Sequence, residues 1–235
     1  LGFPLYRLNM DSHLTRGDLV GMNRLVRSEG GGTEMRFVEG LVPRALKGPS
    51  IMLIDEIDLG DPEIMPVLQP VLEGKGIRLL EDGGRYVRPH PFSRIFATAN
   101  TIGLGSEDMT YLNVHEQSAA MRDRIGRYIE MPYLPSDMEI EVVMERVPHA
   151  DRSFVENLVK LANHMRDARR KNNAAQVIST RAVINAAKRH ANYVKRYTEP
   201  ALAERTTIEV VMQNRCDANS RTVMQGFIEA IFNWK

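Results

Sequence analysis

The sequence is short of several features that would fix its class at once. It has one cysteine, Cys216, in 235 residues, so no internal disulfide can form, and we expect a soluble cytoplasmic protein. No apolar run reaches the ~18 residues of a membrane span. Lysine and arginine number 31 against 30 acidic residues, and this balance provides no general attraction to nucleic acid or to an anionic membrane. The six histidines show no metal-ligand spacing.

A nucleotide-binding loop is missing as well. The pattern G-x-x-x-x-G-K-[ST], whose backbone N–H groups and lysine hold nucleotide phosphates, occurs nowhere in the sequence. The nearest glycine-rich stretch, "EGGGTE", has no following lysine and is typical of a flexible turn. The 235 residues therefore do not contain the usual site for ATP phosphates.

The patterns that are present change character near residue 135. Before it, short apolar runs alternate with glycine-rich or proline-rich turns, and this pattern predicts an α/β sheet domain over residues 1–135. After it, apolar positions recur three and four apart, and this spacing predicts an all-helical domain over residues 136–235. A first helix is expected to begin at Ser136 as N-cap, with Glu139 at the capping-box position. Four further helices are expected over 151–172, 179–197, 200–213 and 218–233.

Three carboxylates follow the apolar run "SIMLIDEIDLGDPE": Asp55, Glu56 and Asp58. A strand with apolar residues throughout is typical of a central parallel strand, and ligands of such sheets gather at the carboxyl ends of the strands. There one carboxylate can contact a magnesium ion while its neighbour faces a water that attacks a phosphate. The alternative is a set of acidic residues that open the next helix and favour its positive end.

Four other residues are candidates for the functional site, and three of them also have an ordinary interpretation. Asn100 ends the run "SRIFATAN", which we expect beside the first strand; its amide can orient a water, or it can form a turn. Arg122 and Arg124, in "MRDRIGRYIEM", precede a strand-like run and can reach a γ-phosphate from a neighbouring subunit, or they are surface charges. Arg181 lies in the first turn of a helix that Ser179 or Thr180 can cap.

Taken in order, these segments resemble the AAA+ ATPases of the MoxR and chelatase branch. "IMLIDEID" is similar to a Walker B strand, "ATAN" to sensor one, "MRDR" to the arginine-finger region and "STR" to sensor two. The strings "LNMDSHLTRGDLVG", "DGGRYVRPHPFSRIFATANTIGLG" and "MRDRIGRYIEMPYLP" resemble the CobS-like ATPase subunits of aerobic cobaltochelatases. The resemblance implies an α/β fold, with an N-terminally truncated P-loop-type parallel sheet core followed by a small helical lid domain.

The resemblance also implies roles for single residues and for cofactors. Asp55 corresponds to the acid on the magnesium side, Glu56 to the acid that polarises the attacking water, and Asn100 to a residue that helps to place this water. ATP and Mg²⁺ are the cofactors it implies for the intact protein. Because this family carries its phosphate-binding loop upstream, the chain is expected to begin just after that loop and to bind ATP poorly by itself.

For the arginines, the resemblance implies that Arg124 is the finger acting on a neighbour's nucleotide, with Arg122 as the rival. Arg181 would contact the bound phosphates from the lid, as a nucleotide-binding residue like Asp55. Such a finger implies a homo-oligomeric ring. A degenerate, non-hydrolysing assembly or regulatory module of the same shape stays open as the alternative.

Two hairpins complete the resemblance. The glycine turns of "LVRSEGGGTEMRFVEG" and "GIRLLEDGGRYVRPH" predict them independently, and Arg27, Glu34 and Arg36 are expected near the tip of the first. In this family such hairpins face the pore or a partner. The implied partners are a protein with a von Willebrand A-type domain and a large chelatase subunit that inserts cobalt into a corrin ring; a MoxR-like ATPase with another client is the alternative. No membrane or nucleic-acid partner is expected.

Overall fold

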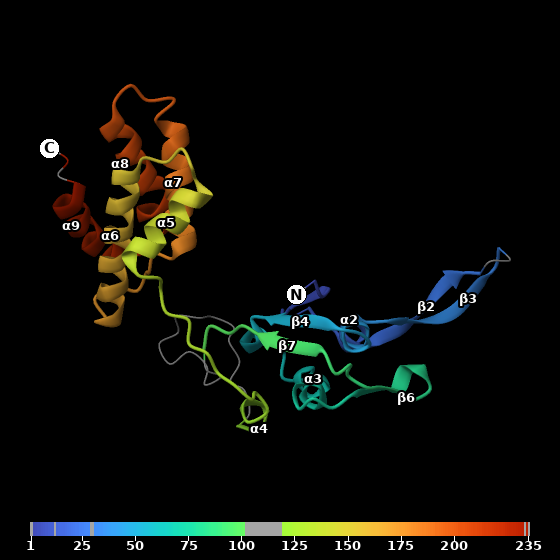
Figure 1. Cartoon of the computed structure of the whole chain (residues 1–235). Coiled ribbons are helices and arrows are strands. Elements are labelled where there is room, and N and C mark those ends of the chain that lie inside the picture. The colour runs from blue at the N-terminus through green and yellow to red at the C-terminus, as the bar shows by residue number, and fades with distance from the viewer. Residues whose placement is uncertain (1, 12, 29–30, 102–118, 233, 235) are drawn as a thin grey trace. The chain divides into compact units, whose positions relative to one another are not determined.

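The computed structural model describes residues 2–11, 13–28, 31–101, 119–232 and 234 (Figure 1). The chain forms two compact units, Leu1–Ile129 and Glu130–Lys235. The first contains a parallel sheet with helices and two hairpins, and the second is helical. The predicted α/β fold followed by a helical region is therefore confirmed.

Three parallel strands form the sheet of the first unit. They are β1 (Leu5–Asn9), β4 (Ser50–Asp55) and β7 (Ser93–Ala97), in the order β1-β4-β7. The register pairs Asn9 with Asp55 and Ile54 with Ala97, so all three strands end at the same edge. The prediction that the "SRIFATAN" strand lies beside the "IMLIDE" strand is confirmed.

One face of this sheet forms the core of the unit. Met52 and Ile54 of β4 are fully buried, and they belong to a cluster that includes residues of α1 (Arg16–Val20), α2 (Leu41–Leu46) and α3 (Met65–Leu72). Side chains alternate along a strand, so Ile51 and Leu53 lie on the opposite face. There Leu5 is 61% exposed and Phe96 56% exposed. Within the described residues, β4 is therefore nearly completely buried on one face and only partly buried on the other. A central parallel strand of apolar residues was expected to be buried on both faces.

Both predicted hairpins are present. In the first, β2 (Gly21–Arg27) pairs antiparallel with β3 (Thr33–Glu39), and Figure 1 shows this hairpin projecting from the sheet. In the second, β5 (Ile77–Leu79) and β6 (Arg85–Val87) flank the short helix η2 (Leu80–Asp82). The second turn depends on glycine because Gly83 and Gly84 have φ values of 60° and 77°, where a side chain is strained.

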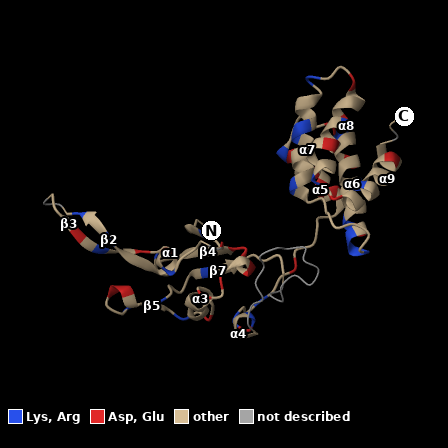
Figure 2. Ribbon diagram, turned by 180° about the vertical axis from the view of Figure 1, so that it is seen from behind, with Lys and Arg blue, Asp and Glu red and all other residues tan. Residues whose placement is uncertain are grey.

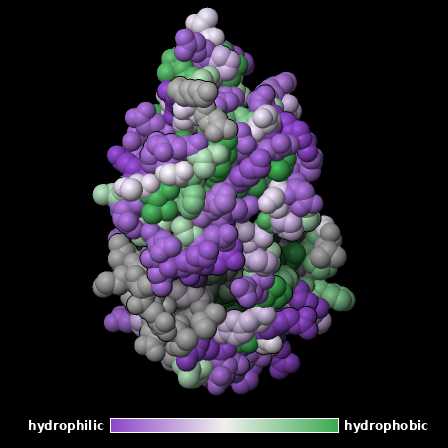
Figure 3. Space-filling view, turned by 90° about the vertical axis from the view of Figure 1, so that its left-hand side faces the viewer, coloured by the Kyte–Doolittle hydropathy of each residue, from purple (hydrophilic) through white to green (hydrophobic). Residues whose placement is uncertain are grey.

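Five α-helices form most of the described part of the second unit: α5 (Ser136–Arg146), α6 (Arg152–Arg170), α7 (Thr180–Tyr193), α8 (Pro200–Val211) and α9 (Ala218–Phe232). They agree with the predicted helices to within a few residues at each end. Their apolar faces form one core. Figure 3 shows one face of the chain, on which most residues are hydrophilic and the hydrophobic areas between them are small. In the described part of the chain, no helix combines the length and the apolar composition that a membrane span requires.

Two local predictions are wrong. Ser136 is the first residue of α5 rather than its cap, and its hydroxyl accepts a hydrogen bond from Asn163 of α6 at 2.9 Å. The strand-like run after Arg124 forms no strand, because its backbone joins no ladder and its apolar side chains are exposed, with Ile129 72% and Met131 85% exposed. At Ser136, the contact with Asn163 overrides the local pattern.

A buried ion pair replaces the expected capping box. Glu139 of α5 and Arg166 of α6 are 0% and 2% exposed, and two hydrogen bonds of 2.7 and 2.8 Å join them. The hydroxyl of Thr180, at the start of α7, donates to the same carboxylate at 2.7 Å. Burial pushes the Glu139 pKa upward, but the hydrogen bonds from Arg166 and Thr180 outweigh it and hold this pKa below its ordinary value. This network joins three helices at the point where α7 begins.

Replacing Glu139 with glutamine is expected to destabilise the helical unit by about 3 kcal/mol, because the charge of Arg166 is then left buried without its counter-ion. Trp234 is the sole tryptophan and packs against the core of this unit. Its fluorescence during urea unfolding therefore measures the effect. The matched control is Glu141→Gln on the same helix, whose side chain is 64% exposed in its pair with Arg152. Equal unfolding midpoints for the two variants would contradict a stabilising role for the buried pair.

Candidate functional site

The carboxyl ends of β4 and β7 bring the first predicted residues together. Asp55 is the last residue of β4, and Thr98, directly after β7, donates its hydroxyl hydrogen bond to the Asp55 carboxylate. The Thr98 hydroxyl also accepts the backbone N–H of Glu56 at 3.0 Å. The two strand ends are thus tied side by side through one threonine. Thr98 lies within the quoted "ATAN" but was not among the predicted site residues.

Glu56 has a left-handed backbone conformation, with φ 56° and ψ 49°. This conformation is uncommon for a residue with a side chain and costs about 1 kcal/mol. It turns the chain sharply from β4 into the short helix η1 (Ile57–Leu59), and the Glu56 side chain is exposed while Asp55 is partly buried. The two neighbouring carboxylates therefore have different surroundings, as a division of labour between them requires.

Asp55 also carries an ion pair that the sequence did not reveal. Arg7 of β1 donates to the Asp55 carboxylate through Nε at 3.1 Å and through one terminal nitrogen. The parallel register explains the pair, since Arg7 lies opposite Leu53 and two residues before the end of β1. The Arg7 side chain is 59% exposed, so its attraction to Asp55 is screened by solvent. Arg7 can therefore leave Asp55 at small energetic cost when another cation approaches.

Asp58 holds the segment that contains Asn100. Its carboxylate is fully buried, and one oxygen accepts the backbone N–H groups of Asn100 and Thr101 at 2.9 and 3.0 Å and the Thr101 hydroxyl at 3.2 Å. The side chain of Asn100 is exposed, two residues after Thr98. The third carboxylate of the acidic run is therefore a support for Asn100. It is buried, although it also lies in the first turn of η1.

The two arginines of "MRDR" differ in their surroundings. Arg122 is the last residue of α4 (Ala119–Arg122), and its carbonyl accepts the Tyr128 hydroxyl at 3.1 Å. Arg124 donates through Nε to Glu73, at the end of α3, at 2.5 Å and also donates to the carbonyl of Ala120. Within its own chain, Arg124 is thus tied to α3 and not to the Asp55 edge.

Glu73 forms ion pairs with two cations, Lys75 and Arg124. Hydrogen bonds from Lys75 and then from Arg124 hold the pKa of the Glu73 carboxyl below its usual range, against a small opposing effect of burial. The carboxylate is therefore ionised at neutral pH. The Arg124 contact is partly exposed, with 27% of the arginine side chain and 25% of the Glu73 side chain accessible. Arg124 can exchange this partner for another anion.

Arg181 belongs to the helical unit. It is the second residue of α7, is exposed, and follows the N-cap Ser179, whose hydroxyl accepts the N–H of Ala182 at 3.3 Å. The predicted capping of this helix by Ser179 is confirmed. Thr180 instead bonds the buried Glu139, so the buried network fixes the turn that presents Arg181.

The residues at the strand edge fit a nucleotide-bound Mg²⁺. Among the described residues, no three His, Cys, Asp or Glu side chains are grouped to hold a metal by themselves. Mg²⁺ in nucleotide sites needs only one or two carboxylates, since phosphate oxygens and water complete its shell. Asp55, with the Thr98 hydroxyl beside it, offers such a donor set.

Comparison with known families matches both units. Residues 1–125 match the AAA domain of the dynein-related subfamily, and residues 139–221 match the CbbQ/NirQ/NorQ C-terminal family. The AAA match covers the whole sheet and both hairpins.

Individual proteins agree with this assignment. The chain is 34% identical over 236 aligned positions to a Sinorhizobium protein named aerobic cobaltochelatase subunit CobS, covering 99% of this chain and 68% of that protein. It is 24% identical over 183 positions to an uncharacterized protein of Staphylococcus saprophyticus, covering 77% of this chain and 66% of the relative. An uncharacterized protein of Staphylococcus aureus is 26% identical over 163 positions, or 69% of this chain and 59% of the relative. The chain thus spans about two thirds of the length of these relatives.

The family matches and the similarity to CobS confirm the resemblance stated from the sequence. The Asp55–Glu56 strand end and the Asn100 segment are the parts of the site that the fold brings together. The protein belongs to the AAA+ ATPases, in the branch that includes the ATPase subunit of cobaltochelatase.

Proposed function

We propose that this chain is part of an ATP-hydrolysing motor subunit that remodels or activates a protein partner. The observation that carries the proposal is the placement of Asp55 and Glu56 at the end of β4, joined through Thr98 to the segment of Asn100. Phosphoryl transfer to water depends on positioning and on charge stabilisation, and these side chains can provide both. The phosphate-binding loop is not among the 235 residues, so the proposal concerns the full-length protein.

Each residue has one task in this proposal. Asp55 holds the magnesium ion, which supplies charge neutralisation for the phosphates when bound. Glu56 accepts a hydrogen bond from the attacking water and takes up its proton, and the Asn100 amide orients the same water. Arg124 acts on the nucleotide of a neighbouring subunit, for which it must leave Glu73; Arg122 is the alternative finger. Arg181 contacts the phosphates from the helical unit.

The name of one relative supports the proposal that this chain has partner proteins. The Sinorhizobium protein is named as a subunit of aerobic cobaltochelatase, so we propose that this chain likewise works in an assembly with other subunits. A homo-oligomeric ring, a partner with a von Willebrand A-type domain, a large chelatase subunit and a cytoplasmic location are parts of this proposal. The exposed side chains of Leu25 and Met35, 71% and 65% accessible, lie opposite each other on the first hairpin and are available for a client.

Phosphate release from ATP by the purified full-length protein tests the proposal. We expect turnover that requires Mg²⁺ and that is lost in Asp55→Ala, because the variant cannot hold the metal beside the phosphates. The Arg7→Ala variant is the matched control, since it removes the other half of the ion pair and leaves the carboxylate in place. ATP binding without turnover in the unmodified protein would favour the non-hydrolysing module instead.

Replacing Asp58 with alanine is expected to lower kcat about tenfold or more with little change in the KM for ATP. The substitution removes the acceptor for the Asn100 and Thr101 backbone N–H groups, so the Asn100 amide is no longer held where it orients water. Asp61→Ala is the control, because the Asp61 carboxylate accepts the backbone N–H of Glu63 within its own turn, at 2.8 Å. Steady-state kinetics separate the two constants, and an unchanged kcat for Asp58→Ala would contradict the positioning role.

A further inference from the structure

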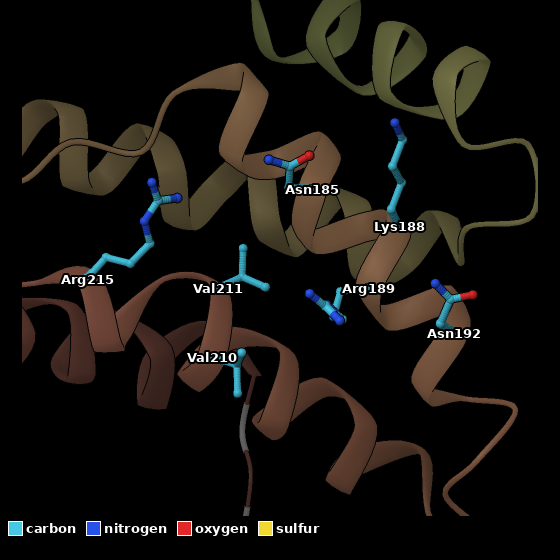
Figure 4. Close-up of a pocket in the computed structure, with 7 residues that line it drawn as sticks. All are labelled: Asn185, Lys188, Arg189, Asn192, Val210, Val211 and Arg215. Carbon is cyan, nitrogen blue, oxygen red and sulfur yellow. The ribbon is translucent and has the colours of Figure 1, made fainter.

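A cleft of about 360 Å³ lies between α7 and α8 in the helical unit and is not used by the proposed ATPase site (Figure 4). Its lining residues come from α7, from α8 and from the short helix η3 (Gln213–Arg215). They are Asn185, Lys188, Arg189, Asn192, Val210, Val211 and Arg215. Figure 4 shows Arg189 and the two valines between the helices, Asn192 further along α7, and Lys188 pointing away from the valines.

The charged residues that line this cleft are all positive. Lys188, Arg189 and Arg215 are exposed, and within the described residues none of them forms an ion pair. Arg189 has a cation–π contact with Tyr193, 6.0 Å from the ring centroid. Figure 2 shows Lys and Arg residues along α7. The three positive charges around Val210 and Val211 repel one another, and an anionic ligand relieves this repulsion.

The cleft continues along α7. A neighbouring cavity of about 90 Å³ shares Val211 and Arg215 with it and reaches Ser179 and Ala182 at the start of the helix. α7 has 14 residues and is therefore about 20 Å long. An extended polypeptide of about six residues covers that length. The shape suits a linear ligand that lies along α7.

The lining distinguishes between classes of ligand. Small-molecule sites enclose most of the ligand, whereas the polar lining residues of this cleft are exposed. Single-stranded nucleic acid needs aromatic rings on which bases stack, and no aromatic residue lines either cavity. Asn185 and Asn192 can donate to and accept from peptide groups, and Val210 and Val211 can contact an apolar side chain. These properties suit a polypeptide that carries carboxylates.

We propose that the α7–α8 cleft binds an acidic, extended peptide segment of a partner protein. Carboxylates of this segment pair with Arg189 and Arg215, and the charge of Lys188 adds long-range attraction. An apolar side chain of the segment contacts Val210 and Val211. Because the charged groups are exposed, the affinity falls as salt is added. The proposal does not depend on ATP hydrolysis by this protein.

Fluorescence anisotropy with the full-length protein and no nucleotide tests this proposal. The probe is a labelled eight-residue peptide of alternating glutamate and leucine or valine. We expect saturable binding that weakens at least tenfold in the double variant Arg189→Glu/Arg215→Glu, because reversed charges repel the peptide carboxylates. The matched control is Lys160→Glu/Arg146→Glu, which reverses two exposed charges of α6 and α5 that do not line the cleft. The control variant should bind as the unmodified protein does.

Three results would overturn the proposal: no saturable binding of the acidic peptide, equal weakening in both double variants, or tighter binding of a labelled twelve-residue oligothymidine than of the peptide. Trp234 fluorescence shows whether each variant retains the packed helical unit. If the charge reversal unfolds it, Arg189→Gln/Arg215→Gln replaces it, and this milder variant is expected to weaken binding severalfold. Turnover assays are read separately, so failure of the ATPase proposal leaves this result unaffected.

Discussion

Glu56→Gln in the full-length protein is expected to lower ATP turnover about a thousandfold while ATP binding persists. The carboxylate is the one exposed acid at the end of β4, and its backbone N–H is fixed by Thr98. Glutamine has the same size, so the left-handed turn and the position of Asp55 are retained. What is lost is the ability to take up a proton from the attacking water. Phosphate release at saturating ATP measures turnover, and titration with a fluorescent ATP analogue measures binding.

The control for this variant is Glu63→Gln, an exposed glutamate on the turn before α3. Its removal should leave both quantities unchanged. Turnover of Glu56→Gln within a fewfold of the unmodified protein would show that another group accepts the proton. Loss of ATP binding together with turnover would instead show that the left-handed turn of Glu56 shapes the nucleotide site, and it would contradict a purely chemical role.

The sequence predicts the framework of the site because the framework is local. "SIMLIDE" and "SRIFATAN" each combine an apolar run with a polar end, and parallel strands must place such ends at one edge. The turns of the hairpins were predictable for a similar reason, since only glycine readily adopts the φ values found at Gly83 and Gly84.

The contacts that complete the site are long-range, and a single sequence does not show them. Arg7 and Asp55 are 48 residues apart, and only the β1–β4 register brings them together. Asp58 was quoted with its two neighbours, but its support of Asn100 depends on where β7 ends. In the same way, Glu139 has the spacing of a capping box and is instead recruited by Arg166 of the next helix. A buried cation attracts a carboxylate more strongly than an exposed helix end does.

Arg124→Ala is expected to lower turnover by about three orders of magnitude, as for arginines that act on a neighbour's phosphates. Within one chain, Arg124 is paired with Glu73. To act on a nucleotide, it must exchange Glu73 for an anion that another chain provides. If that anion is the phosphate of the next subunit, the defect belongs to an interface between two chains. Mixing Arg124→Ala subunits with Glu56→Gln subunits then restores some interfaces, because one chain supplies the arginine and the other the carboxylate. At equal amounts and random assembly, about a quarter of the interfaces are complete.

Phosphate release from the mixture, compared with that of each variant alone, measures this restoration. Arg122→Ala is the matched control two residues away on the same segment, and it should neither lose turnover to the same extent nor need complementation. Rescue of Arg122→Ala in place of Arg124→Ala would identify Arg122 as the finger. Failure of both mixtures to exceed the single variants would contradict catalysis across a subunit boundary, and the Arg124–Glu73 pair would then be a structural contact between α3 and the segment after α4.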